Sequence, residues 1–170
     1  LEIIEAHWLF GIPGERIDVV VHPQSVVHSM VEFRDGTVLA QLGRTDMRIP
    51  IQYALSYPEV WETPLEPMDL GAAFSLAFEP PDHARFKSLQ LAKEALERGG
   101  TTPAAMNAAN EVAVQAFLDG EIPFTGITEI VSDVVKRHTP KSAEAPEAVL
   151  LADRAAPAQA RGACPARHPA

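Results

Sequence analysis

The order of apolar and polar positions predicts a β-hairpin in the first third of the chain. Side chains alternate in character from Val27 to Phe33, and a second run of strand-forming residues extends from Thr37 to Leu42. Between them, Arg34-Asp35-Gly36 supplies the glycine that a tight turn with positive φ requires. Upstream, the β-branched run Ile17–Val21 predicts a short buried strand, which Pro23 would end.

Helical periodicity dominates the rest of the chain. Apolar residues recur at helical spacing from Leu1 to Phe10, before Gly11, and a short helix is expected over Ile51–Ser56. Further helices are expected from about Phe86 to Gly99, from Thr102 to Gly120 and from Thr125 to about His138, and Pro146 can sit in the first turn of a fourth. Their apolar faces are formed by Phe86, Leu89, Ala92 and Leu96, by Met106, Ala109, Ala113 and Phe117, by Ile127, Ile130, Val131, Val134 and Val135, and by Val149, Leu150 and Leu151. Such a succession predicts a small helical bundle.

Composition divides the chain at the same places. Residues 1–57 form an α/β (α+β) part with the hairpin sheet, and residues 58–83 form a connector with prolines at 58, 64, 67, 80 and 81. Residues 84–153 form the α-helical bundle. Residues 154–170 are rich in Ala, Pro and Arg without an apolar period, which predicts a disordered tail. Because no capping residue precedes Leu1, we expect the first helix to begin upstream and the chain to be a fragment.

Charge and cysteine content restrict the possible partners. The 170 residues carry a net charge of −9 and are 46% hydrophobic, which is typical of a globular protein. Without a basic stripe, neither nucleic acid nor an anionic membrane is an expected partner. A single cysteine, Cys164, closes no intrachain disulfide, so we expect a reducing cytoplasm. No apolar run is long enough for a bilayer span.

Polar residues near the predicted hairpin are candidates for a site. Glu2 and Glu5 share one face of the first helix, as a solvated face or as oxygen ligands for Mg²⁺ or Mn²⁺. His22, Ser25 and His28 surround the turn after the first strand, where the histidines either bond to backbone or line a site. A nucleophilic Ser25 is not favoured, because no Gly-x-Ser-x-Gly elbow surrounds it.

The loop Asp46-Met47-Arg48 offers a second candidate. Asp46 and Arg48 suit an ion pair at the start of a helix, whereas the flexible thioether of Met47 suits contact with a ligand. No glycine-rich phosphate loop occurs in the chain, so we expect no dinucleotide site within it. Asn107, Asn110 and Glu111 interrupt an alanine-rich helix and are expected to fix its docking onto another segment.

Several long runs of residues resemble the 1-deoxy-D-xylulose 5-phosphate reductoisomerase family. The matching runs are LEIIEA with WLF in residues 1–10, HPQSVVHSMV in 22–31, DG at 35–36 with LAQLG at 39–43, DMRIPI in 46–51, and AAMNAANE in 104–111. The resemblance extends over about residues 1–138. Runs of this length are far more specific than a short motif.

The resemblance implies an enzyme that rearranges 1-deoxyxylulose 5-phosphate and reduces the product with NADPH to 2-C-methylerythritol 4-phosphate, in isoprenoid biosynthesis. It implies an NADPH domain and the start of a catalytic domain upstream, and a homodimer. The chain would then hold the end of the α/β catalytic domain, the connector and the C-terminal helical domain. NADPH would bind outside this chain, with Mg²⁺ or Mn²⁺ as the second cofactor.

The same resemblance assigns roles to individual residues. Glu2 aligns with the last of three metal-binding carboxylates and would hold the ion that chelates the substrate. His28 would support catalysis beside it, His22 and Ser25 would line the site from beneath, and Met47 would lie near the nicotinamide and the substrate. The alternative is a non-enzymatic dimerisation or interaction module, which the lack of a nucleotide loop favours.

Overall fold

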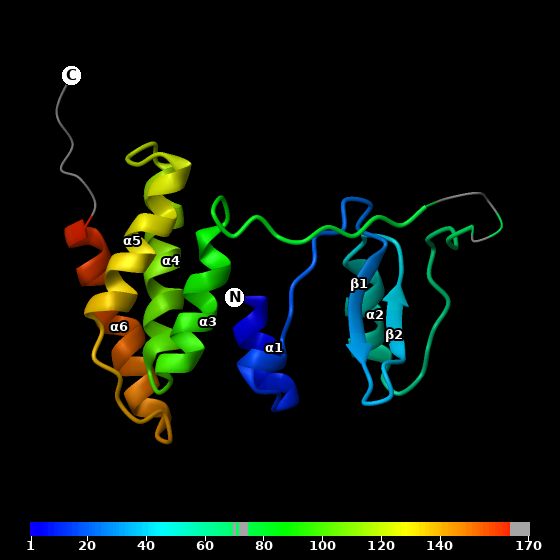
Figure 1. Ribbon diagram of the computed structural model, residues 1–170, viewed down its shortest axis with the longest axis horizontal. Coiled ribbons are helices and arrows are strands. Elements are labelled where there is room, and N and C mark those ends of the chain that lie inside the picture. The colour runs from blue at the N-terminus through cyan, green and yellow to red at the C-terminus, as the bar shows by residue number, and fades with distance from the viewer. Residues whose placement is uncertain (70, 72–74, 164–170) are drawn as a thin grey trace. The chain divides into compact units, whose positions relative to one another are not determined.

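The computed structural model describes residues 1–69, 71 and 75–163. The elements follow in the order α1 (Glu2–Phe10), the 3₁₀ helix η1 (Gly14–Arg16), β1 (Val27–Glu32), β2 (Val38–Leu42), α2 (Arg48–Ser56), α3 (Lys87–Arg98), α4 (Thr102–Leu118), α5 (Phe124–Arg137) and α6 (Pro146–Ala163) (Figure 1). They form two compact units: residues 1–18 together with those from Asp82 onward, and residues 19–81. We call them the helical unit and the hairpin unit.

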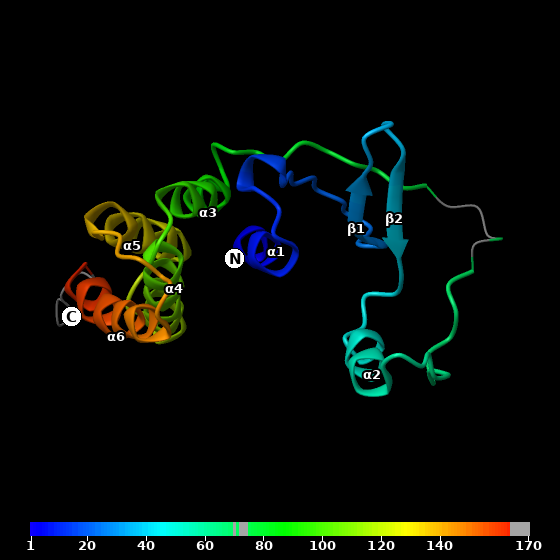
Figure 2. The same cartoon turned by 90° about the horizontal axis from the view of Figure 1, so that it is seen from below.

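Helix α4 is central to the helical unit. It packs against α3, α5 and α6, and both views show it beside α5 and α6 (Figures 1 and 2). Its buried face consists mainly of small side chains: Thr102, Ala105, Met106, Ala108, Ala109, Ala113 and Ala116. Small side chains allow neighbouring helix axes to approach closely, so larger residues such as the fully buried Val134 and Val135 of α5 fill the space between. Burying each valine contributes about 1.5–3 kcal/mol.

A polar junction joins the loop after α3 to the end of α5. The Arg98 guanidinium donates hydrogen bonds to the carbonyl oxygens of Val135 and His138, at the negative end of α5. The Thr101 hydroxyl lies 2.9 Å from Nε2 of His138 and accepts a hydrogen bond from the Lys141 N–H at 3.2 Å. Gly100 precedes it with φ +53°, where a Cβ would overlap the Lys141 carbonyl oxygen, so the close approach requires glycine.

The predicted hairpin is confirmed in the hairpin unit. Strands β1 and β2 pair antiparallel, with Glu32 opposite Val38 and Met30 opposite Ala40, and the register shifts between Val27 and Ser29. Gly36 has the expected positive φ of 81°. The Asp35 carboxylate accepts a hydrogen bond from the Thr37 N–H at 2.9 Å, and this bond lowers the pKa of Asp35. Large apolar side chains are exposed along the pair, namely Met30, Val31, Phe33, Val38 and Leu39.

The expected strand over Ile17–Val21 is not formed. Within this run, only Val21 pairs, in an isolated antiparallel bridge with Glu79 whose two hydrogen bonds measure 2.8 and 2.9 Å. A buried strand needs partners along its length, and the described part of the chain provides one bridge. A β-branched run alone therefore does not specify a strand.

The tail prediction is wrong for residues 154–163, because α6 continues through Pro157 to Ala163. Ala156 and Ala160 are buried, one helical turn apart, and α6 packs on α4. Alanine has the highest helix propensity, and this small-residue stripe matches that of α4. Residues 164–170, with Cys164, lie outside the described residues. The division into units also differs from the expected one, because α1 groups with the helical bundle instead of the hairpin.

The Thr101 hydroxyl is expected to stabilise the bundle. Replacing Thr101 by Val removes the group that joins His138 and Lys141, and we expect the free energy of unfolding to fall by about 1–2 kcal/mol. Urea unfolding followed by circular dichroism measures this change. Thr139→Val, at an exposed position, is the matched control and should have little effect. Equal stability losses for the two variants would contradict this role of Thr101.

Protonation of His138 is expected to weaken the same junction. Burial lowers the pKa of His138 below its ordinary value of 6.5, and the Arg98 and Lys141 cations lower it further. The unfolded chain therefore takes up the proton at a higher pH than the folded chain, so stability is complete above pH 6.5 and declines as the pH falls through the folded pKa. Urea unfolding at a series of pH values should show this decline, and His138→Gln should flatten it. The same pH slope in both proteins would contradict the assignment.

Candidate functional site

The predicted site residues lie in both units. Glu2 is in the helical unit, whereas His22, Ser25, His28 and Met47 are in the hairpin unit.

Glu2 is an exposed carboxylate at the first residue of α1. Ile3 and Ile4 hold the helix by burying the opposite face, and the acidic first turn suits the positive end of the helix dipole. Among the described residues, Glu2 forms no hydrogen bond or ion pair, so its oxygens are available to a ligand. Glu5 instead borders a groove of about 420 Å³ with Trp8 and, from the bundle, Pro103, Ala104 and Asn107.

His22 is attached to the segment around residue 77. Its Nδ1 donates a hydrogen bond to the Ala77 carbonyl at 2.8 Å, and its ring stacks on Phe78 with 4.7 Å between centroids. Nε2 is buried and has no hydrogen-bond partner in the described part of the chain. The side chain of Gln24 adds a bond at 3.2 Å from the Ala77 N–H. His22 therefore anchors the turn that follows it.

Ser25 and His28 face the loop of residues 43–48 through hydrogen bonds. Ser25 has φ +50°, and its carbonyl accepts a bond from the Thr45 hydroxyl at 2.9 Å. Nε2 of His28 bonds to the Gly43 carbonyl at 3.2 Å, and the Gly43 N–H donates to Val26 at 2.9 Å. Both histidines bond to backbone carbonyls through one ring nitrogen.

A hollow of about 600 Å³ lies beside this contact. Ser25, Arg44, Thr45 and Asp46 contribute to its wall together with Leu65 and Met68. Arg44 reaches the Pro67 carbonyl at 3.2 Å, which brings the connector to this wall. Sequence reasoning did not identify Thr45 or Arg44, because contacts to residues about twenty positions away have no local signal in the sequence.

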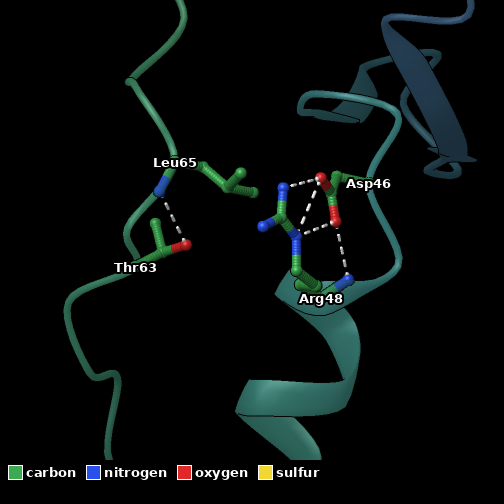
Figure 3. A network of polar contacts seen from close by, with 4 residues as sticks. All are labelled: Asp46, Arg48, Thr63 and Leu65. Carbon is green, nitrogen blue, oxygen red and sulfur yellow. Dashed lines mark hydrogen bonds and ion pairs between the residues drawn. The ribbon is translucent and has the colours of Figure 1, made fainter.

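The expected ion pair between Asp46 and Arg48 is present. The Asp46 carboxylate accepts bonds from Nε and Nη2 of Arg48, at 3.0 and 2.6 Å, and a third from the Arg48 backbone N–H at 2.9 Å (Figure 3). These bonds lower the pKa of Asp46 to about 2 and raise the pKa of Arg48. Met47 lies between them at the start of α2, and the residue is 71% exposed.

Among the described residues, no group of three His, Cys, Asp or Glu side chains is arranged to hold a metal ion. None of the helices in this part of the chain is long and apolar enough to cross a membrane. The exposed carboxylate of Glu2 is an oxygen donor of the type that Mg²⁺ binds.

Two curated proteins show how closely the sequence matches known enzymes. The 1-deoxy-D-xylulose 5-phosphate reductoisomerase of Symbiobacterium thermophilum is 60% identical over 154 residues, covering 91% of this chain and 40% of that protein. The enzyme of Cupriavidus pinatubonensis is 56% identical over 161 residues, covering 95% of this chain and 41% of that protein. The chain thus spans about two fifths of the length of these relatives.

Solved structures and a family model agree with these matches. The Zymomonas mobilis reductoisomerase in complex with NADPH superposes with a TM-score of 0.88 at 46% identity, covering 98% of this chain and 44% of that one. A DOX-P reductoisomerase in complex with NADPH, fosmidomycin and magnesium superposes with a TM-score of 0.88 at 40% identity. The match covers 96% of this chain and 42% of that one. The model of the DXP reductoisomerase C-terminal domain matches residues 42–159. On this evidence, the chain belongs to the 1-deoxy-D-xylulose 5-phosphate reductoisomerase family.

Proposed function

We propose that this chain is the C-terminal part of an enzyme that converts 1-deoxy-D-xylulose 5-phosphate to 2-C-methyl-D-erythritol 4-phosphate with NADPH and a divalent metal ion. The observation that carries the proposal is the 60% identity to the Symbiobacterium enzyme over 91% of the chain. Solved relatives in complex with NADPH, fosmidomycin and magnesium support both cofactors. The reaction would serve isoprenoid biosynthesis.

The two units correspond to parts of different domains in this proposal. The bundle of α3 to α6 is the C-terminal helical domain, and the hairpin unit is the end of an α/β catalytic domain. The exposed apolar residues of β1 and β2 support this assignment, because a two-stranded sheet with uncovered faces is stable only as part of a larger sheet. Further strands and the NADPH domain would come from the remaining length of the enzyme.

Glu2 is proposed as a metal ligand, and through the ion as a substrate-binding and catalytic residue. Its carboxylate is exposed and unpaired among the described residues, and it fits Mg²⁺ or Mn²⁺ by its oxygen chemistry. A bound divalent ion would act as a Lewis acid on substrate oxygens. Because the described residues contain no group of three candidate metal ligands, the other ligands would come from the rest of the protein.

The hairpin unit is proposed to shape the pocket around the substrate. His28 is the candidate for a direct catalytic contact, since its ring is exposed and its Nε2 is held at Gly43. His22 and Ser25 would support the pocket through the turn that they hold, and Met47 would contact the nicotinamide or the substrate. We also propose a homodimer, because each strand of the hairpin has an outer edge that a partner sheet can extend.

Activity of the complete protein tests the proposed function. The full-length product of the gene that encodes this chain should oxidise NADPH when 1-deoxy-D-xylulose 5-phosphate and Mg²⁺ or Mn²⁺ are both present. Loss of absorbance of the reduced nicotinamide measures the rate. No turnover with either metal, in a folded protein that binds NADPH, would reject the reductoisomerase and favour an interaction module.

Replacing Glu2 by Gln is expected to weaken metal binding and to reduce turnover by about 100-fold or more in the same protein, because a neutral amide replaces an anionic ligand. Titration with Mn²⁺, followed by its paramagnetic signal, measures the affinity without turnover. Glu147→Gln is the matched control, since Glu147 is an exposed acid in the first turn of α6. Unchanged metal affinity in Glu2→Gln would remove Glu2 from the site.

A further inference from the structure

We propose that Asp46 and Arg48 are positioning residues, which fix the backbone that carries Met47 in the loop that is hydrogen-bonded to the turn of His22 to His28. The proposal rests on the proposed function, in which Met47 contacts the nicotinamide or the substrate. It adds two residues that act through Met47 and do not themselves touch the reacting atoms.

The hydrogen bonds form a closed ring across Met47. One carboxylate oxygen of Asp46 accepts from both the backbone N–H and Nε of Arg48, at 2.9 and 3.0 Å, and the other accepts from Nη2 at 2.6 Å (Figure 3). A carboxylate that binds two nitrogen atoms of one planar guanidinium has a more restricted geometry than a carboxylate with a single hydrogen bond. The backbone on both sides of Met47 is therefore fixed by one side chain.

Neighbouring backbone contacts complete this restraint. The Met47 carbonyl accepts the Ile51 N–H at 3.2 Å in the first turn of α2, and the Asp46 carbonyl accepts the Ile49 N–H at 3.2 Å. Met47 has helical dihedral angles, φ −65° and ψ −17°. The main chain of Met47 is thus restrained, although the residue as a whole is 71% exposed.

The same loop is joined to the turn that carries the candidate histidines. Thr45 bonds to the Ser25 carbonyl at 2.9 Å, and Gly43 is held by Val26 and His28, at 2.9 and 3.2 Å. A displacement of the loop would therefore move the turn as well. The hydrogen bonds between Asp46 and Arg48 consequently keep the loop of Met47 and the turn of His28 in a constant position relative to each other.

Stability alone does not explain this arrangement. Exposed ion pairs contribute little to folding, and the Arg48 side chain is 66% exposed. Ordering an exposed methionine buries no apolar surface in return. Positioning does explain it, because a contact group that is ordered before the ligand arrives reduces the entropy lost on binding and keeps the reactants aligned. The carboxylate of Asp46 remains ionised at neutral pH, since its pKa is about 2.

A double-mutant cycle in the full-length enzyme tests the proposal. We expect Asp46→Ala to lower kcat by about 10-fold to 100-fold, because the Met47 contact loses its fixed position. Asp46→Asn keeps an oxygen that can accept from the Arg48 N–H, so its kcat should fall less than that of Asp46→Ala. In the Met47→Ala background, Asp46→Ala should have no further effect on kcat, because the group that it positions is already absent.

Asp133→Ala is the matched control, because Asp133 and Arg137 form an ion pair of similar exposure, 2.9 Å apart, on α5. It should leave kcat unchanged. Thermal unfolding and Mn²⁺ affinity, measured for every variant, separate positioning from misfolding, and Arg48→Gln replaces Asp46→Ala if the latter does not fold. The proposal would be overturned, with the parent enzyme active, if Asp46→Ala lowered kcat equally in the parent and in the Met47→Ala background. It would also be overturned if Asp46→Ala lowered kcat in neither. An inactive but folded parent would instead reject the proposed function itself.

Discussion

The small side chains of α4 are the constraint on which the helical unit depends. Ala105, Ala109 and Ala113 are completely buried, so α5 and α6 pack close to the α4 backbone. A methyl group added to one of these alanines would have no space, because the valines of α5 fill the volume between the helices. Arg98 and Thr101 then join the loop after α3 to the end of α5, where polar backbone groups would otherwise lack hydrogen-bond partners.

The helices and the hairpin were predictable because their signals are local. The alternation around Arg34-Asp35-Gly36 identifies the turn, and the predicted stripe of α5 includes most of its buried residues, whereas Ala92 is the one buried residue of α3 that the predicted stripe contains. Phe86 and Phe117, which were assigned to apolar faces, are 47% and 36% exposed, and Phe117 stacks edge-on against Phe124 at the end of the bundle. Its position near the last turn of α4 places it beyond the packed faces.

The remaining features depend on contacts distant in sequence. The strand expected at Ile17–Val21 finds one bridge, from Val21 to Glu79, in the described chain, and the α6 extension depends on Ala156 and Ala160 packing against α4. Glu2, His22, Ser25, His28 and Met47 were selected by resemblance and by residue chemistry. Thr45 and Gly43 attach the turn of His22 to His28 to the loop of residues 43–48. Their hydrogen bonds join positions that neither helical nor strand periodicity relates. Assigning roles at the site therefore required both the family match and the geometry.

The uncovered hairpin has a practical consequence for anyone who produces this segment by itself. Each outer edge of β1 and β2 presents backbone donors and acceptors, and apolar side chains such as Leu39 and Phe33 lie beside them in water. An edge of this kind recruits strands from other molecules, so the isolated polypeptide would self-associate as its concentration rises. Charged substitutions at Val31 and Leu39 would make it easier to handle without changing the helical bundle.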